Sequence, residues 1–157
     1  RFFMITDPVK VKIAGAPKKK IELNLHPDAH KGGRHLEIGE DFIFSEKDVE
    51  GLEEGKVHRL MDCLNFTRKG EEFIFHSEEY PAFKDAKKKG RIIHFLPDSK
   101  ENVKVKIVMD DASVLEGVGE STTSLAKVNE VVQAERFGFL RVDKKGKDLV
   151  EFWFSHK

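Results

Sequence analysis

The sequence predicts an all-β protein, built mainly from short strands with one or two short helices. Apolar and charged residues alternate over segments such as 9–13 and 103–107, and a period of two is typical of a strand with one buried face. Turn-forming glycine and proline residues separate many of these segments, at the short spacing found in small barrels and sandwiches. Hydrophobic residues make up 39% of the 157 residues, which is enough for packed cores.

The first third of the chain is predicted to form several short strands. The segment 26–35 has a loop composition, with one proline and two glycines. Ser45 precedes acidic residues at 46 and 48, which indicates one helical turn, because a serine hydroxyl can cap free backbone amides. The expected strands are 2–5, 9–13, 21–25, 36–38 and 42–44.

The remaining chain is predicted to contain two long strands, at 56–67 and 131–143. The best helix candidate is 77–89, where several lysines near the end would offset the helix dipole. Gly138 lies inside the second long strand, where glycine usually marks a bulge or a close backbone approach. Shorter strands are expected at 71–76, 91–96, 103–109, 113–118 and 149–154.

The chain contains a weak internal repeat, 1–13 against 91–107. The sequence Val-Lys-Val-Lys-Ile at 9–13 recurs identically at 103–107. Upstream, Arg-Phe-Phe-Met-Ile at 1–5 parallels Arg-Ile-Ile-His-Phe at 91–95. Self-similarity of this kind predicts a duplication, and therefore two related barrels rather than one, although chance alternation of valine and lysine is the competing explanation.

Composition excludes several classes of protein. Lysine plus arginine equals aspartate plus glutamate at 28 each, which argues against a sequence-blind nucleic-acid binder, since such proteins are usually basic. Cys63 is the single cysteine, so no internal disulfide can form; a buried, inert thiol in a reducing, cytoplasmic compartment is expected. No apolar run approaches the ~20 residues of a membrane helix, and no signal peptide is visible. The start at Arg1, directly at a strand, suggests an excised fragment.

Catalytic and metal chemistry are not expected in this chain. His26, His30 and His35 lie close together in sequence, but their spacing fits no closed zinc pattern. No glycine-rich phosphate loop or nucleophile elbow is present. The basic clusters 18–20, 87–91 and 144–147 are expected to be solvated turns, with phosphate contacts as the alternative.

Two residues of the segment 131–143 have the chemistry of base recognition. Gln133 offers donors and an acceptor, and Arg136 offers a flat fork of donors. Such a pair can read the edge of an unstacked base, whereas the alternative is two solvated side chains on a barrel exterior. Residues three apart point to opposite faces of a regular strand. Both can therefore serve one pocket only if the strand is bulged or twisted between them.

The segment 133–139, Gln-x-Glu-Arg-Phe-Gly-Phe, resembles a motif of the anticodon-binding region in glutaminyl- and archaeal-type glutamyl-tRNA synthetases. Arg1 with Asp7-Pro8-Val9-Lys10 resembles the segment that follows the catalytic domain of that family. Further matches are Leu25-His26-Pro27 with Gly33-Arg34, the segment 55–62, and Ile93-His94-Phe95. The matches run in order over nearly all of the chain.

This resemblance implies two six-stranded barrels that exchange strands, expected as 1–50 plus 126–157 and as 51–125. It implies a monomeric anticodon-binding region of an archaeal-type glutamate-tRNA ligase, with tRNA for glutamate, and possibly glutamine, as partner and no membrane. A catalytic domain before Arg1 in the same polypeptide would use ATP and magnesium, and no cofactor is expected in this chain, which lacks that family's ATP signatures.

The resemblance also implies which residues contact RNA. Arg1, Gln133 and Arg136 match positions that enclose the middle anticodon base, a uridine. Arg59 matches an arginine that faces the first base and its phosphate. Met61-Asp62 replaces an Arg-Asn pair of the glutamine branch, and 48–54 lacks its Gln-x-Lys-Arg cluster, so recognition of the flanking bases is not carried over. The alternatives are the same region of a glutaminyl-tRNA synthetase, and a barrel scaffold that binds RNA or protein without reading bases.

Overall fold

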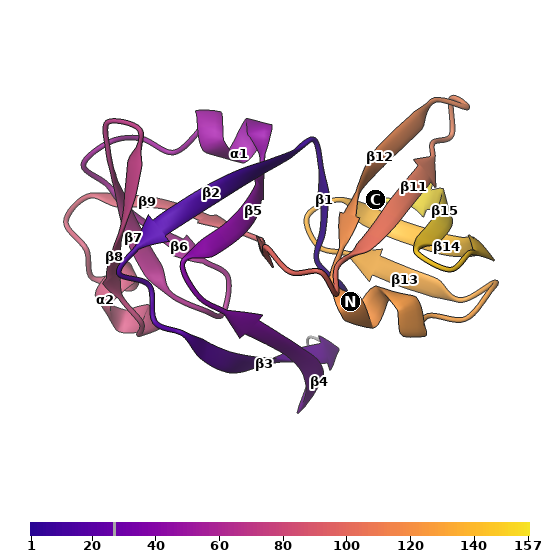
Figure 1. Ribbon diagram of the computed structural model, residues 1–157, viewed down its shortest axis with the longest axis horizontal. Helices are drawn as coiled ribbons and strands as arrows, with labels where there is room; N and C mark the ends of the chain where they lie inside the picture. Colours follow the sequence, from indigo (N-terminus) through magenta and orange to yellow (C-terminus); the bar gives the residue numbers. More distant parts are fainter. Residues whose placement is uncertain (27) are drawn as a thin grey trace.

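The computed structural model describes residues 1–26 and 28–157, with only the backbone of Lys31. The molecule has two β-rich lobes side by side, one holding β2 and β5 to β9 and the other holding β11 to β15 (Figure 1). Two short helices, α1 (Glu46–Glu50) and α2 (Tyr80–Lys84), and one 3-10 turn, η1 (Ser121–Leu125), complete the described elements. The all-β prediction is confirmed. Both α-helices are five residues long, so no helix of the described chain can cross a membrane.

The first lobe is a sheet whose two edges are joined by one segment. In spatial order its strands are β10 (Leu96–Pro97), β5 (Asp41–Ser45), β2 (Pro8–Ala14), β8 (Glu72–Ser77), β7 (Asn65–Lys69), β6 (Val57–Leu60) and β9 (Lys89–Ile93). The end strands β9 and β10 both belong to the segment 89–97, which pairs with β6 on one side and with β5 on the other. Five strands and this segment therefore close a six-stranded barrel.

The second lobe closes in the same way. Its order is β1 (Met4–Thr6), β12 (Val114–Gly119), β11 (Val103–Val108), β15 (Leu149–His156), β14 (Gly138–Lys145) and β13 (Val131–Ala134). Strand β1 pairs with β12, and Phe2, just before it, bridges to Ala134 of β13. The segment 2–6 thus joins both edges of this sheet.

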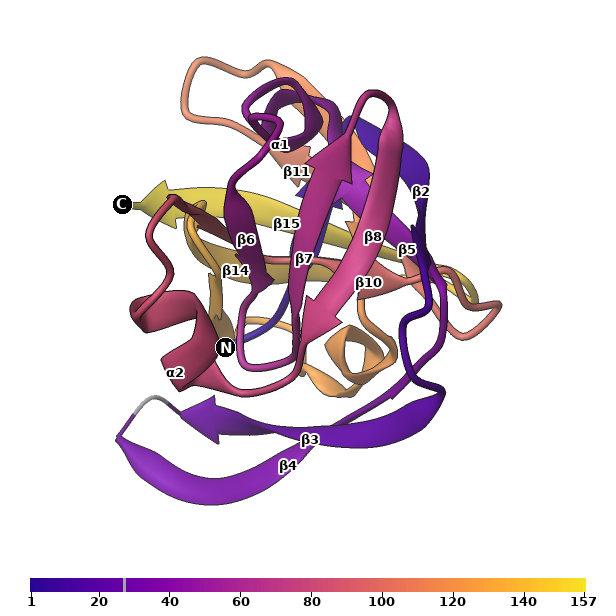
Figure 2. The same ribbon diagram turned by 90° about the vertical axis from the view of Figure 1, so that its left-hand side faces the viewer.

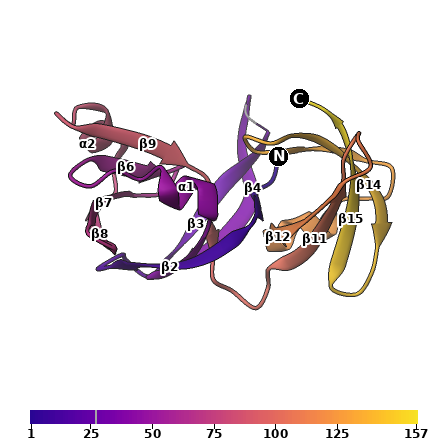
Figure 3. The same ribbon diagram turned by 90° about the horizontal axis from the view of Figure 1, so that it is seen from above.

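Relative to the repeat, in which each closing segment is followed by a Val-Lys-Val-Lys-Ile strand, the closing segments are exchanged between the lobes. Segment 1–6 leads directly into β2 of the first barrel but lies in the second, and segment 89–97 precedes β11 of the second barrel but lies in the first (Figures 1 and 3). Two six-stranded barrels with exchanged strands are therefore confirmed. The sheets do not follow the expected division into 1–50 plus 126–157 and 51–125. Strands β2 and β5 lie in the same sheet as β8, whereas β11 and β12 lie in the same sheet as β15.

The internal repeat corresponds to equivalent strands. Ile13 of β2 pairs in parallel with Phe73, and Ile107 of β11 pairs in parallel with Phe152. Each strand has an antiparallel neighbour on its other side, β5 or β12. The identical Val-Lys-Val-Lys-Ile segments therefore occupy the same place in the two barrels.

The exchanged segments are equivalent with a shift of one residue. Ile5 pairs with Val118, and Leu96 pairs with Ile43; these partners hold matching positions on β12 and β5. Strand pairing thus aligns Ile5 with Leu96, one residue from the alignment that the sequence suggests.

Other local predictions held in part. Ser45 caps α1 by accepting a hydrogen bond from the Asp48 amide, as expected. The helix predicted over 77–89 is only α2, and Lys89 already begins β9. The hairpin of β3 (Lys19–His26) and β4 (Ala29–Ile38) is a separate two-stranded sheet that extends along the base of the view in Figure 2.

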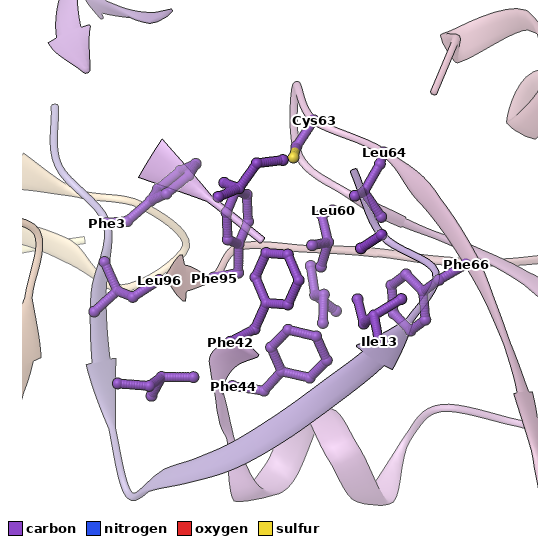
Figure 4. Close-up of a cluster of buried hydrophobic side chains, with 14 of the residues drawn as sticks. Phe3, Ile13, Phe42, Phe44, Leu60, Cys63, Leu64, Phe66, Phe95 and Leu96 are labelled. Carbon is purple, nitrogen blue, oxygen red and sulfur yellow. The ribbon is translucent and has the colours of Figure 1, made fainter. Parts of the chain in front are cut away.

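Phenylalanine rings fill the core of the first barrel and connect it to the exchanged segments (Figure 4). Phe42, Phe44, Phe66 and Phe95 are almost completely buried. Phe3 lies 5.5 Å from Phe95, ring centroid to ring centroid, so the two exchanged segments pack against each other.

The single cysteine lies in this core. The Cys63 thiol is buried, and burial raises its pKa to about 12. The expected burial of this thiol is confirmed.

A buried ion pair fixes the junction of the lobes. The Glu120 carboxylate accepts hydrogen bonds from Nε and Nη2 of Arg34, each at 2.7 Å, and from the Phe3 amide at 3.1 Å. The exposed fraction is 2% for Arg34 and 0% for Glu120. The pair therefore connects β4, the end of β12 and the N-terminal segment, with no solvent to replace a missing partner.

We expect Glu120→Ala to lower the free energy of unfolding by about 3–5 kcal/mol, because it leaves a buried guanidinium without its counterion. The measurement is the urea unfolding curve followed by circular dichroism. Lys20→Ala, which removes the exposed pair of Lys20 and Glu37, serves as control and should cost under ~1 kcal/mol. Equal losses for the two variants would contradict the role of the buried pair.

Candidate functional site

The segment predicted as one strand, 131–143, is a hairpin. Strands β13 and β14 are joined by Glu135, Arg136 and Phe137, and the Phe137 amide donates to the Ala134 carbonyl at 3.1 Å. Arg136 has a φ of 60°, a left-handed conformation that costs roughly 1–2 kcal/mol in a residue with a Cβ. The turn therefore removes the objection that Gln133 and Arg136 must point to opposite faces of one strand.

Gly138 follows the turn at a close approach of two strands. A Cβ at this position would lie 2.8 Å from the His156 carbonyl oxygen. This confirms the expectation that the glycine allows a close backbone approach.

The exchanged N-terminal segment brings Arg1 to this hairpin. The Phe2 amide donates to the Gln133 carbonyl at 2.8 Å, and the Glu135 amide donates to the Phe2 carbonyl at 3.0 Å. The Arg1 guanidinium forms an ion pair with the Glu135 carboxylate through Nε. Its Nη2 lies 3.5 Å from Sδ of Met61. Residues from opposite ends of the chain, Arg1 and Gln133, thus lie side by side.

Arg136 is held by residues of the first barrel. Its Nη1 and Nη2 donate to the two Asp48 carboxylate oxygens at 2.8 and 2.9 Å, and Nη1 also lies 3.1 Å from Nδ1 of His94. Burial acts to raise the pKa of Asp48, but the Arg136 hydrogen bonds and charge hold it below its ordinary value. The pKa of Arg136 is raised by the same hydrogen bonds. The two charged groups therefore stabilise each other across the junction.

His94 is set by its own contacts as a neutral acceptor. Its Nε2 lies 2.8 Å from the Met4 carbonyl oxygen, which can only accept, so Nε2 carries the proton and Nδ1 accepts from Arg136. Burial lowers the pKa of His94, and the charge of Arg136 lowers it further. A protonated His94 would lose its acceptor atom and place a cation against the guanidinium.

These contacts leave part of the site unused. A guanidinium has five N–H donors; Arg136 uses three, so Nε–H and one Nη2–H, adjacent on one edge, have no partner among the described residues. The side-chain amide of Gln133 is half-buried and also makes no hydrogen bond within the described chain. The hairpin thus presents two donors of Arg136, whose guanidinium is held by Asp48 and His94, and the amide of Gln133 on the adjoining strand.

A hollow of about 290 Å³ lies beside the turn, between α1, β1 and β9. Glu135 and Arg136 belong to its wall, whereas Arg1 and Gln133 lie on the adjoining segments. Its lining residues are Met4, Thr6, Ser45, Lys47, Asp48, Arg91, His94, Glu135, Arg136 and Phe137.

Arg59, the fourth predicted contact, lies in the first barrel and is occupied by the fold. Its Nη1 donates to Oδ1 of Asn65 at 2.8 Å and to the Glu78 carbonyl at 3.0 Å. The guanidinium lies over the ring of Tyr80, 5.5 Å from its centroid. Its contact with a base stays a prediction. Tyr80, which we did not anticipate, is about half exposed beside it.

The histidines of the first third have separate partners. His26 lies near Asp28, His30 near Asn24 and His35 near Glu22. Among residues 1–26 and 28–157, no group of three or more side chains is placed to hold a metal ion. Pro27 of the predicted Leu-His-Pro motif lies outside the described residues.

Sequence reasoning missed the partners of the predicted residues. Asp48 is 88 residues from Arg136 in sequence, and His94 is 42 residues away. Their only local signals are the capped turn for Asp48 and the Ile-His-Phe motif for His94, and neither indicates a contact with a distant arginine.

Buried neutral histidines predict a pH dependence of stability. Burial lowers the pKa of His58 and His94 from the ordinary 6.5, so the unfolded chain binds protons at a higher pH than the folded chain does. The free energy of unfolding should therefore fall as pH drops below about 6.5 toward the lowered values. Urea midpoints measured between about pH 8 and pH 5 test this.

The matched variants are His94→Gln and His58→Gln, each of which should flatten the pH dependence. His76→Gln, at an exposed position, is the control and should leave it unchanged. A wild-type midpoint that stays constant over this range would contradict the prediction.

Comparison with known proteins shows to which family the chain belongs. Residues 1–80 match the family model described as tRNA synthetases class I (E and Q), anti-codon binding domain. Over its whole length the chain is 37% identical to a glutamate-tRNA ligase of Methanocaldococcus jannaschii and 39% identical to one of Methanothermobacter marburgensis. A third such ligase, from Methanococcus maripaludis, is 34% identical.

The chain spans only 28%, 27% and 28% of the length of these three relatives. The family match covers more than half of the chain and includes Arg1, the exchanged segment 1–6 and the first barrel up to Tyr80. The chain belongs to the family of class I tRNA synthetase (E and Q) anticodon-binding domains.

Proposed function

We propose that this chain is the anticodon-binding region of a glutamate-tRNA ligase and reads the middle anticodon base, a uridine. The observation that carries the proposal is the convergence of Arg1, Gln133 and Arg136 on one hairpin, where donors of Arg136 and the Gln133 amide have no partner within the described chain. A catalytic domain of the same polypeptide would join glutamate to the tRNA with ATP and magnesium. A cytoplasmic monomer fits this role.

The chemistry of the turn matches an extruded uridine. That base presents two carbonyl acceptors and one N–H on its edge. The free Nε–H and Nη2–H pair of Arg136 can donate to a carbonyl, and the Gln133 amide can both donate to a carbonyl and accept from the N–H. Bases that present other patterns would leave these half-buried groups unpaired, which is the source of discrimination.

Glutamate is preferred over glutamine as the parent's amino acid. The relatives that match over the whole chain are glutamate-tRNA ligases. Met61 and Asp62 form the turn between β6 and β7 in place of the Arg-Asn pair of the glutamine branch, and Met61 contacts Arg1. The alternative, a scaffold that reads no base, predicts equal binding of tRNAs that differ only in the middle anticodon base.

We expect replacement of the middle anticodon base to weaken binding of glutamate tRNA to this chain by about 1–3 kcal/mol, by analogy with base-edge contacts in DNA. Arg136→Ala should produce a similar loss with the normal tRNA and little further loss with the altered one. Dissociation constants measured at one fixed salt concentration test this, since phosphate contacts make affinity salt dependent.

The control is Arg141→Ala, which removes an arginine from over Trp153 on the outer face of β14. It removes the same charge without touching the turn and should leave discrimination between the two tRNAs intact. Equal binding of both tRNAs to the wild-type chain would support the scaffold alternative instead.

We also expect Asp48→Asn to reduce the discrimination between the two tRNAs, because Arg136 loses the ion pair that fixes its free donors. Asp98→Asn is the matched control, since it removes the charge of a carboxylate that pairs with Lys10 and lies outside the hollow beside Arg136. The ratio of the two dissociation constants is the measurement. Loss of discrimination in both variants would assign the effect to the loss of a carboxylate charge in general rather than to the pair of Asp48 and Arg136.

A further inference from the structure

The hollow beside Arg136 has a surplus of positive charge. Its two carboxylates are already paired, Asp48 with Arg136 and Glu135 with Arg1. Lys47 and Arg91 also belong to the wall, and neither forms an ion pair within the described residues. Two cations without an ion pair among the described residues therefore line a space whose own carboxylates are already paired.

The cations come from different segments that the fold brings together. Lys47 belongs to α1 and Arg91 to β9. The Arg91 guanidinium lies against Gly51 at the end of α1, where an added Cβ would be 2.7 Å from Nη1. The Arg91 amide donates to Nδ1 of His58 at 3.0 Å, which fixes the backbone at this point. Arg91 is thus directed toward α1 by packing as well as by its strand.

Size and polarity restrict the ligand class. The hollow, at about 290 Å³, falls just below the usual range of ~300–1,000 Å³ for sites that enclose drug-sized molecules. The hydroxyls of Thr6 and Ser45 lie in the wall with the cations, and Met4 and Phe137 are the apolar members among the lining residues. Guanidinium groups pair well with phosphate oxygens, and hydroxyls can donate to the same oxygens.

We propose that this hollow binds one backbone phosphate of the anticodon loop between Lys47 and Arg91, next to the free donor edge of Arg136. The inference rests on the proposed function and extends it. Phosphate contacts set the register of the RNA, whereas base contacts supply the specificity. Lys47 and Arg91 would thus hold the strand while Gln133 and Arg136 read the base.

Of the basic clusters in the sequence, only 87–91 contributes a residue to this wall. Lys18 instead borders a hollow with Glu37, Glu40 and Asp41, where acidic groups would repel a phosphate. Among the basic clusters of the sequence, Arg91 is therefore the residue placed beside the turn that holds Arg136.

The test uses the anticodon stem-loop of glutamate tRNA, with one loop phosphate at a time replaced by a neutral methylphosphonate. We expect one position to weaken binding to the wild-type chain by about tenfold, the value of a charge-assisted hydrogen bond. The Lys47→Ala/Arg91→Ala variant should lose this dependence on position. It should also reduce the slope of log affinity against log salt by about 0.7–1, equally for normal and base-replaced RNA.

The control variant is Lys12→Ala/Lys104→Ala, which removes one exposed lysine from each barrel outside the hollow. It should keep the position-specific effect. Lys47→Gln/Arg91→Gln repeats the test with longer side chains, and circular dichroism verifies that each variant is folded.

Two outcomes separate this proposal from the function on which it rests. If the Lys47/Arg91 variants keep wild-type affinity, salt slope and position dependence while middle-base replacement still weakens binding, the phosphate site is overturned and base reading stands. If base replacement has no effect but the position-specific effect disappears in these variants, the phosphate site stands without base reading.

Discussion

The need to pair the open edges of two sheets determines the arrangement of this molecule. Unpaired strand edges leave backbone donors and acceptors without partners and invite association with other chains. Here each barrel is closed by a segment that belongs in sequence to the other repeat. The position of Arg1 beside Gln133 is therefore a consequence of barrel closure. The candidate site therefore forms only when the N-terminal segment is paired with the second barrel. The packing of Phe3 on Phe95 and the buried pair of Arg34 and Glu120 stabilise that arrangement.

The two barrels place two equivalent turns at the junction. The Met61 amide donates to Ile93 at 2.9 Å, and the Glu135 amide donates to Phe2 at 3.0 Å. The residues after them, Asp62 and Arg136, have φ values of 55° and 60°. The two turns therefore have the same backbone conformation but different side chains.

Those two sets differ in how far the fold uses them. In the first barrel the position equivalent to Gln133 is Arg59, whose guanidinium is bound to Asn65 and Glu78. In the second barrel Gln133 keeps its amide free within the described chain. The two turns therefore share a backbone arrangement but differ in whether the equivalent polar side chain is bound within the described chain.

The sequence predicted the fold class, the repeat and the residues of the turn, but not the turn itself. Both long strands, 56–67 and 131–143, are hairpins, and both were missed for the same reason. Of the residues that usually mark a turn, Met61-Asp62-Cys63 contains only the aspartate and Glu135-Arg136-Phe137 contains none. Their left-handed residues are held by backbone bonds to the exchanged segments, and such non-local contacts leave no local pattern. The same limit hid Asp48 and His94, the partners of Arg136.

On the proposed function, a chain of zero net charge needs one set of contacts to attract RNA and another to recognise its bases. Arg1 and Arg136 are each paired with a carboxylate, so they add little to the long-range field that draws RNA to basic proteins. Pairing instead fixes the direction of the donors that remain. Because Asp48 holds Nη1 and Nη2 of Arg136, the guanidinium can offer only the edge formed by Nε–H and the second Nη2–H. An ion pair that would be wasteful in a sequence-blind binder thus becomes useful where discrimination, rather than affinity, is the task.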